Sequence, residues 1–125
     1  MQVPAIRIGA VPEPEFQLLL AATDVGVNLR YPSAGESSGV LARLMALGKP
    51  AMVTRGEELS HLPPGIVWPV SPGPQEAEEL ALGMAYLAQH RLARQAMGLA
   101  AKEYAIAECA VEVLAQRLAG LLASV

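Results

Sequence analysis

Four short apolar runs, separated by stretches with helical periodicity, are the feature of this sequence that most restricts its fold. The runs cover residues 5–10, 24–29, 50–54 and 65–70. Each is too short for a typical helix and is bounded by proline, glycine or polar residues, as strands are. Strands that alternate with helical segments over short connections predict an α/β fold, with a parallel sheet flanked by helices and built from right-handed βαβ units.

The helical segment between the first two runs has a clear beginning and end. Two prolines near its start suit the first turn of a helix, Phe16 and Leu20 fall on one face, and the helix should end near Thr23. The run 24–29 that follows is apolar over almost its whole length, which is the pattern of a strand buried on both faces.

A second helix is predicted over residues 40–47, with Ser37 and Ser38 able to cap its start and Gly48 able to close it. Prolines beside Trp68 indicate that the fourth strand lies at an edge of the sheet. From about residue 75 onward the apolar residues keep helical spacing. This predicts a helical C-terminal segment of two or three helices.

The chain length and charge limit the function classes. With 125 residues, the chain predicts one α/β domain over residues 1–125. The net charge is −3, and the nine lysines and arginines are spread singly, so we expect no nucleic-acid partner. Hydrophobic residues make up 53% of the chain, above the usual content of about 45–50%, which indicates that part of this surface is covered by a partner.

The cellular setting is indicated by two further features. A single cysteine, Cys109, excludes an internal disulfide, so the default expectation is a reducing cytoplasm. No apolar run approaches the roughly 20 residues that cross a bilayer. Any membrane association is therefore expected to be peripheral, at the inner membrane face, through other molecules.

The segment between the second strand and the second helix carries the candidate binding site. A loop that leaves the carboxyl end of a parallel strand and opens a helix points several backbone N–H groups at one spot. Gly35 and Gly39 allow close approach to the backbone, Ser37 and Ser38 add hydroxyl donors, and the helix N-terminus adds partial positive charge. A diphosphate would suit such a site.

Arg30 ends the strand and is the better ligand candidate of the two cations considered, the other being Lys49. Glu36 lies beside the anion site, where its carboxylate can accept hydrogen bonds from sugar hydroxyls, so we expect it to bind rather than to transfer a proton. The alternative is that Ser37 and Ser38 are only a helix cap and that Glu36 only complements the helix dipole. Spacing alone leaves both interpretations open.

Three segments in order, 24–32 (DVGVNLRYP), 35–39 (GESSG) and 44–50 (LMALGKP), resemble the donor-binding domain of retaining GT-B glycosyltransferases, the glycogen-synthase-like and mannosyltransferase-like family. The similarity runs from about Ile6 to the C-terminus. It implies a Rossmann-like sheet that binds a nucleoside-diphosphate sugar. Glu36 matches the first glutamate of the family's paired-glutamate motif and would contact the transferred sugar, while the backbone at Ser38, Gly39 and Val40 would face the diphosphate.

The sequence also departs from this family. The second glutamate of the motif, which usually holds the nucleotide ribose, would fall at Arg43 or Leu44. The N-terminal acceptor-binding domain and the first strand–helix units of the donor domain do not precede Ile6. The resemblance therefore implies transfer of a sugar to a glycan or lipid acceptor only when these parts are supplied, and little turnover by this chain alone.

Several other residues are expected to have structural roles. His61 and His90 have no neighbours at metal-ligand spacing, so no metal site and no cofactor is expected. Cys109 is predicted to be a small buried residue, and Trp68 to serve in packing. The acidic stretch Glu76, Glu78 and Glu79 is predicted to be a solvated helix start.

Two functions of different class remain. One is the nucleotide-sugar-binding part of a glycosyltransferase, with no catalytic residue of its own assigned. The other is a non-catalytic α/β interaction module that self-associates through an exposed edge of the sheet.

Overall fold

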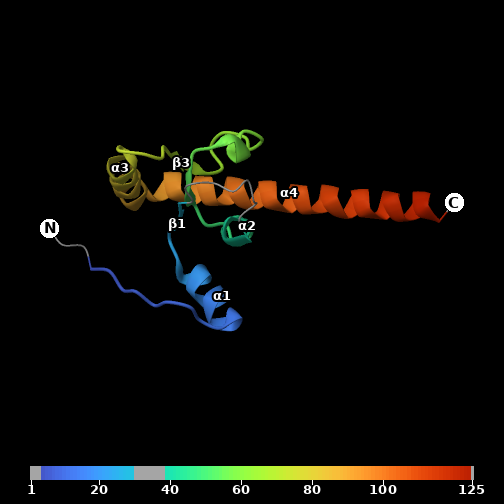
Figure 1. Ribbon diagram of the computed structural model, residues 1–125, viewed down its shortest axis with the longest axis horizontal. Helices are drawn as coiled ribbons and strands as arrows, with labels where there is room; N and C mark the ends of the chain where they lie inside the picture. The colour runs from blue at the N-terminus through green and yellow to red at the C-terminus, as the bar shows by residue number, and fades with distance from the viewer. Residues whose placement is uncertain (1–3, 30–38, 125) are drawn as a thin grey trace.

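The computed structural model describes residues 4–29 and 39–124, and within them a three-stranded parallel sheet with helices around it (Figure 1). The elements follow the order α1 (Glu13–Ala22), β1 (Gly26–Asn28), α2 (Gly39–Ala46), β2 (Ala51–Thr54), the 3-10 helix η1 (Glu57–Leu59), β3 (Trp68–Val70), α3 (Glu76–Gln89) and α4 (Arg91–Ala123). The strand order is β1-β2-β3, so β2 is central and the other two are edges. The predicted mixed α/β fold with a parallel sheet and a helical C-terminal segment is confirmed.

The central strand organises the core because its side chains alternate between the two faces of the sheet. Ala51 and Val53 join a cluster with Leu44 and Met45 of α2 and with Ala101 of α4. Its other members include Leu20, Ile66 and Val67. Helices α2 and α4 therefore cover one face.

The opposite face of the sheet is covered by α3. Met52 and Val70 form a smaller buried cluster there with Leu87, and Trp68 packs against it. All four residues of β2 are buried, as expected for a parallel strand with helices on both faces.

Helix α2 ends in a Schellman motif, which explains the sharp return to β2. The N–H of Lys49 donates to the carbonyl of Leu44 (2.9 Å) and that of Gly48 donates to Met45 (3.0 Å). Gly48 has a φ of +72°, a left-handed conformation that favours glycine. The predicted closing role of Gly48 is confirmed.

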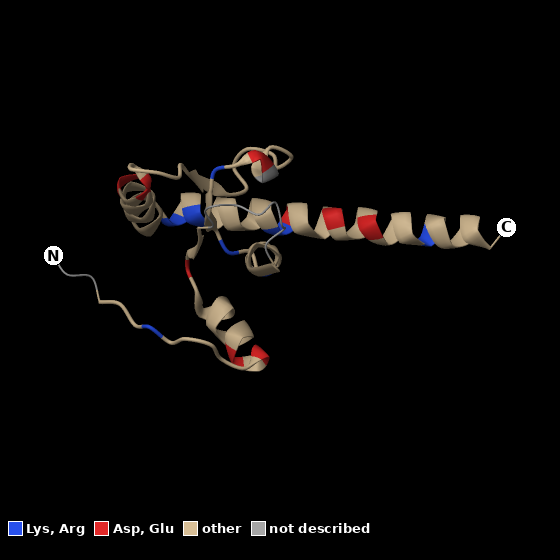
Figure 2. Ribbon diagram, in the orientation of Figure 1, with Lys and Arg blue, Asp and Glu red and all other residues tan. Residues whose placement is uncertain are grey.

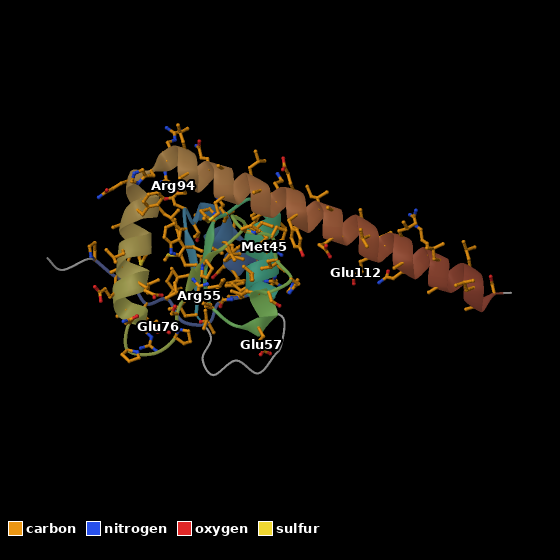
Figure 3. The ribbon with its side chains drawn as sticks, turned by 90° about the horizontal axis from the view of Figure 1, so that it is seen from above. Met45, Arg55, Glu57, Glu76, Arg94 and Glu112 are labelled. Atoms are coloured by element: carbon orange, nitrogen blue, oxygen red, sulfur yellow. The ribbon has the colours of Figure 1, made fainter. Side chains whose placement is uncertain are left out.

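Helix α4 crosses the amino ends of the strands. A Cβ on Gly98 would overlap the backbone carbonyl of Gly48 and would also contact Pro50, so α4 lies directly against the turn that enters β2. Figure 3 shows α4 along one side of the sheet, with α3 running away from it toward the other side. The amino edge of the sheet is thus closed by a helix.

Helices α3 and α4 meet at His90, the residue between them. Its ring stacks on Tyr86 with the ring centroids 4.0 Å apart, and its Nδ1 lies 2.8 Å from the Tyr86 carbonyl oxygen. Arg94 of α4 donates from Nη1 to the carbonyls of Leu87 (2.7 Å) and Ala88 (3.2 Å), the last turn of α3. These contacts fix the corner between the two helices.

Three predictions are corrected. The described part of run 5–10 forms no strand; its residues are exposed, with Ile6 at 88%, and no neighbouring strand pairs with them. β1 is not buried on both faces, because it is an edge strand and Val27 is 44% exposed. Cys109 is exposed rather than buried; it belongs to the second half of α4, in which residues 106–123 are all exposed. The predicted α1, its end at Thr23 and the edge position of β3 are confirmed.

Candidate functional site

The carboxyl ends of the three strands meet at the edge of the sheet opposite α4. β1 ends at Asn28, β2 at Thr54 and β3 at Val70. Helices α2 and α3 both begin on this side, and in Figure 3 Arg55 and Glu76 lie toward it while Arg94 lies at the far end of α3. This carboxyl edge is the position where α/β sheets bind ligands.

The N-terminus of α2 is the part of this edge best suited to an anion. Gly39, the first residue of α2, is exposed, and a Cβ placed on it would meet nothing within 4 Å. No described residue of the first turn of α2 is acidic. The partial positive charge at this helix N-terminus is therefore not neutralised by a carboxylate of its own first turn. Val40 is half-buried and packs on the core, so it can offer only its backbone to a ligand.

The other predicted site residues, Arg30, Gly35, Glu36, Ser37 and Ser38, lie outside the described residues. The residues on either side of segment 30–38, Leu29 and Gly39, are described. Leu29 follows the last residue of β1 and Gly39 opens α2, so both are at the carboxyl edge. The structure therefore positions two of the seven predicted site residues, Gly39 and Val40.

The N-terminus of α3, in contrast, is occupied by carboxylates of its own first turn. Glu79 is half-buried, and its Oε2 accepts a hydrogen bond of 2.6 Å from the backbone N–H of Ser71. Glu76 and Glu78 add negative charge in the same turn. The prediction of a purely solvated acidic face is wrong for Glu79, which ties the end of β3 to α3. An anion at this edge is disfavoured at α3 and favoured at α2.

Sequence reasoning did not select Arg55, although it follows β2 directly. Its side chain is exposed, and its backbone N–H donates to the Val70 carbonyl at 2.8 Å, which holds it at the carboxyl edge. A guanidinium there can make two parallel hydrogen bonds to a phosphate. The sequence did contain a signal for Arg55, because it follows the predicted strand 50–54 directly. Arg30 was selected as a ligand candidate for the same reason, its position at the carboxyl end of a predicted strand.

Arg43 and Leu44 stand where the second glutamate of the resembled family would fall, and neither can replace it. Leu44 is 2% exposed and packs against Gly26. Arg43 pairs with Glu13 of α1, and its guanidinium carbon lies 5.6 Å from the centre of the Phe16 ring. A cation joined to α1 cannot accept hydrogen bonds from ribose hydroxyls as a carboxylate does.

The remaining candidates have structural roles or none. Trp68 packs in the core cluster beside α3, and its ring centroid lies 5.5 Å from that of Tyr86, as expected for a packing residue. Lys49 precedes β2, so it lies at the amino edge, away from the candidate site. Over residues 4–29 and 39–124, no three histidine, cysteine or acidic side chains are grouped so that they could hold a metal ion.

Charge is scattered over the described surface, with lysines and arginines lying singly along the elements (Figure 2). None of the helices in the described part of the chain is both long and apolar enough to cross a membrane.

Comparison of the chain with models of protein families, with curated proteins and with solved structures finds no match. The functional assignment therefore rests on the site itself.

Proposed function

We propose that the carboxyl edge of this sheet binds the diphosphate of a nucleoside-diphosphate sugar, as the donor-binding part of a glycosyltransferase. The observation that carries the proposal is the start of α2. It follows an edge strand and has no acidic residue in its described first turn, and a Cβ on its first residue, Gly39, would meet nothing within 4 Å. A helix N-terminus of this kind is a general anion site.

Two further features support an anionic ligand at this position. Arg55 is exposed at the same edge and can neutralise part of the charge of a diphosphate. The amino ends of the strands lie against α4 at the turn that enters β2, so α4 does not cover the carboxyl ends. Glu36, placed by its sequence position next to this helix start, would accept hydrogen bonds from the sugar.

Transfer of the sugar to a glycan or lipid acceptor would need more than these residues. A departing nucleoside diphosphate requires charge stabilisation and exclusion of water, and such contributions are worth several kcal/mol in related chemistry. We infer that an acceptor-binding domain supplies them. We infer a cytoplasmic setting from the exposed and unpaired Cys109, which suits a reducing compartment.

Calorimetric titration of the full chain with UDP, GDP and their sugar conjugates tests the binding proposal. We expect saturable binding of one nucleotide. Glu36→Ala should weaken binding of the sugar conjugate more than that of the free nucleotide. Arg55→Ala should weaken both about tenfold, the typical effect of losing a charge-assisted hydrogen bond.

Two alanine substitutions form a matched pair for the anion site. Gly39→Ala adds a methyl group at the first residue of α2 and should reduce nucleotide binding. Gly120→Ala, in a helix position that is equally unobstructed, should leave binding unchanged. Absence of binding at millimolar ligand, or equal effects of both variants, would contradict the proposal.

The second candidate is a non-catalytic module that self-associates through the edge of the sheet. The observation that favours it is β1, an edge strand with Val27 44% exposed. Exposed strand edges pair readily with another strand. Loss of association in Val27→Lys, together with no nucleotide binding, would support this module instead.

A further inference from the structure

The second half of α4 is exposed along its whole length. Residues 106–123, which we call the free half, are all exposed, and the helix extends well past the sheet in Figure 1. It nevertheless carries many large apolar side chains: Ile106, Val111, Val113, Leu114, Leu118, Leu121 and Leu122, each at least 40% exposed. Isolated helices of this kind gain most of their stability from packing of an apolar face.

A continuous stripe runs along the side of α4 that faces away from the sheet. We call this stripe the outer face, and it consists of Leu99, Glu103, Ile106, Ala110, Leu114, Arg117 and Leu121. These residues are three or four positions apart, which keeps them on one side of a helix. The average spacing of about 3.7 residues is close to the 3.6 of a straight α-helix, so the stripe does not drift around it.

The outer face lies opposite the side of α4 that packs on the protein. The buried residues Gly98 and Ala101, and the half-buried Ala105, mark the packed side. Leu99 is 57% exposed although both of its neighbours in sequence are at least half-buried. The outer face is therefore accessible along both halves of the helix, including the half that is anchored.

A shallow hollow of about 460 Å³ lies on the outer face of the free half. It is lined by Ile106, Cys109, Ala110, Val113, Leu114 and Arg117. The side of the free half that continues the packed side is polar and acidic, with Glu108, Glu112 and Gln116. Amphipathic helices that bind anionic membranes carry lysine and arginine on their polar side, so this charge pattern favours a protein occupant over a lipid surface.

The chain exposes more area than a compact monomer of its mass. The 13.1 kDa chain exposes 9173 Å² in total, whereas a compact monomer of this mass exposes about 6,400 Å². The excess of about 2,800 Å² belongs to the chain as a whole, and the free half of α4 is one of the described segments that contribute to it. A standard interface buries about 800 Å² per partner.

We propose that the outer face binds the outer face of a second copy of this chain, with the two α4 helices antiparallel and a two-fold axis at Ala110. In this register Glu103 of each copy lies opposite Arg117 of the other, which gives two symmetry-related ion pairs. Leu99 lies opposite Leu121, and Ile106 lies opposite Leu114. The interface is self-complementary in shape and in charge, as two-fold interfaces must be.

The small side chain of Ala110 at the axis allows the two helices to approach closely. The rest of each copy lies on the side of its own α4 that faces away from the partner helix, so the two sheets do not obstruct the contact. The carboxyl ends of the strands lie away from α4, so the helix contact does not cover them. This inference is thus independent of the proposed nucleotide site.

Sedimentation velocity of the full chain measures the first consequence. We expect a species of twice 13.1 kDa that dissociates on dilution. Leu114→Glu should give a monomer, because it places a charge in the apolar stripe. Gln116→Glu, on the acidic side of the same turn, should remain dimeric. A monomeric wild-type chain, or identical behaviour of these two variants, would overturn the proposal.

The ion pairs give a test of direction. Arg117→Glu should weaken dimerisation about tenfold, because two attractive pairs become repulsive. Adding Glu103→Arg should restore it, because the pairs re-form with reversed sign. In a parallel dimer each residue would face its own copy, and the double variant would not recover. Failure of this rescue would overturn the antiparallel register.

Disulfide formation tests the axis itself. Ala110→Cys in a Cys109→Ser background should form an intermolecular disulfide under mild oxidation, whereas Glu112→Cys in the same background should not. Dissociation by Val27→Lys would assign the association to the edge of the sheet and overturn the α4 contact. Circular dichroism before each measurement verifies that every variant is folded.

Discussion

Gly98→Ala tests the contact that anchors α4 to the sheet. The added methyl group would overlap the Gly48 carbonyl and lie 3.0 Å from the Gly48 carbonyl carbon and 3.4 Å from the Pro50 Cδ. These are backbone and ring atoms, which cannot rotate away as a side chain can. Overpacking of this kind costs about 1–3 kcal/mol, partly offset by the higher helix propensity of alanine, about 1 kcal/mol. We expect a net loss of up to about 2 kcal/mol in the free energy of unfolding.

Gly120→Ala provides a matched control in the same helix, because a Cβ there meets nothing within 4 Å. It should cause no loss and give a gain of up to about 1 kcal/mol. Urea denaturation followed by Trp68 fluorescence reports on the sheet, because Trp68 packs in the core cluster beside α3. If Gly98→Ala stabilises the protein as much as Gly120→Ala does, the proposed close packing of α4 on the turn at Gly48 is wrong.

Two further predictions concern the core and the start of the free half. Leu44→Ala should lower the free energy of unfolding by about 2–5 kcal/mol, because Leu44 is 2% exposed and lies in the core. Leu82→Ala, at a site 67% exposed, should lower it by less than about 0.5 kcal/mol. Equal losses in the two variants would contradict the assignment of Leu44 to the core. The pKa of Tyr104 is raised above its ordinary value of 10.0 by desolvation, and further by the charge of Glu108 and the hydrogen bond to it. Its stabilising effect is therefore present below pH 10.0 and lost as the pH rises through the higher folded-state value. Ultraviolet titration of the phenol, with Tyr104→Phe to assign the signal, should show a lower pKa in Glu108→Gln; an unchanged pKa would exclude Glu108 as a cause.

The sequence predicted most of the fold because local signals agreed with one another. The closing of α2 at Gly48 and the edge position of β3 followed from glycine and proline chemistry, which acts within a few residues. The run 5–10 had the same composition as a strand but forms none, because a strand needs a neighbour and periodicity does not supply one. The exposure of Val27 and Cys109 also depends on what lies beside them, which a single run of residues does not encode.

The position of part of the candidate site was predicted from the sequence. Gly39 and Val40 begin α2 on the side of the sheet where the strands have their carboxyl ends, as the alternation of strands and helices predicts; that a ligand binds there stays a prediction. Arg55 was passed over because it stands in a polar turn, where exposed arginines are common. The role of Glu79 depends on the path of the chain between β3 and α3, which brings the Ser71 N–H within 2.6 Å of a carboxylate eight residues later.

The length of the free half of α4 has a mechanical consequence. Helix α4 contains 33 residues, and its first half is held by Arg94, by the stacked rings of Tyr86 and His90 and by the contact of Gly98 with the turn at Gly48. Residues 106–123 form a rod about 27 Å long beyond these contacts. A bend of about 10° at its base would displace its tip by about 5 Å for a rod of that length.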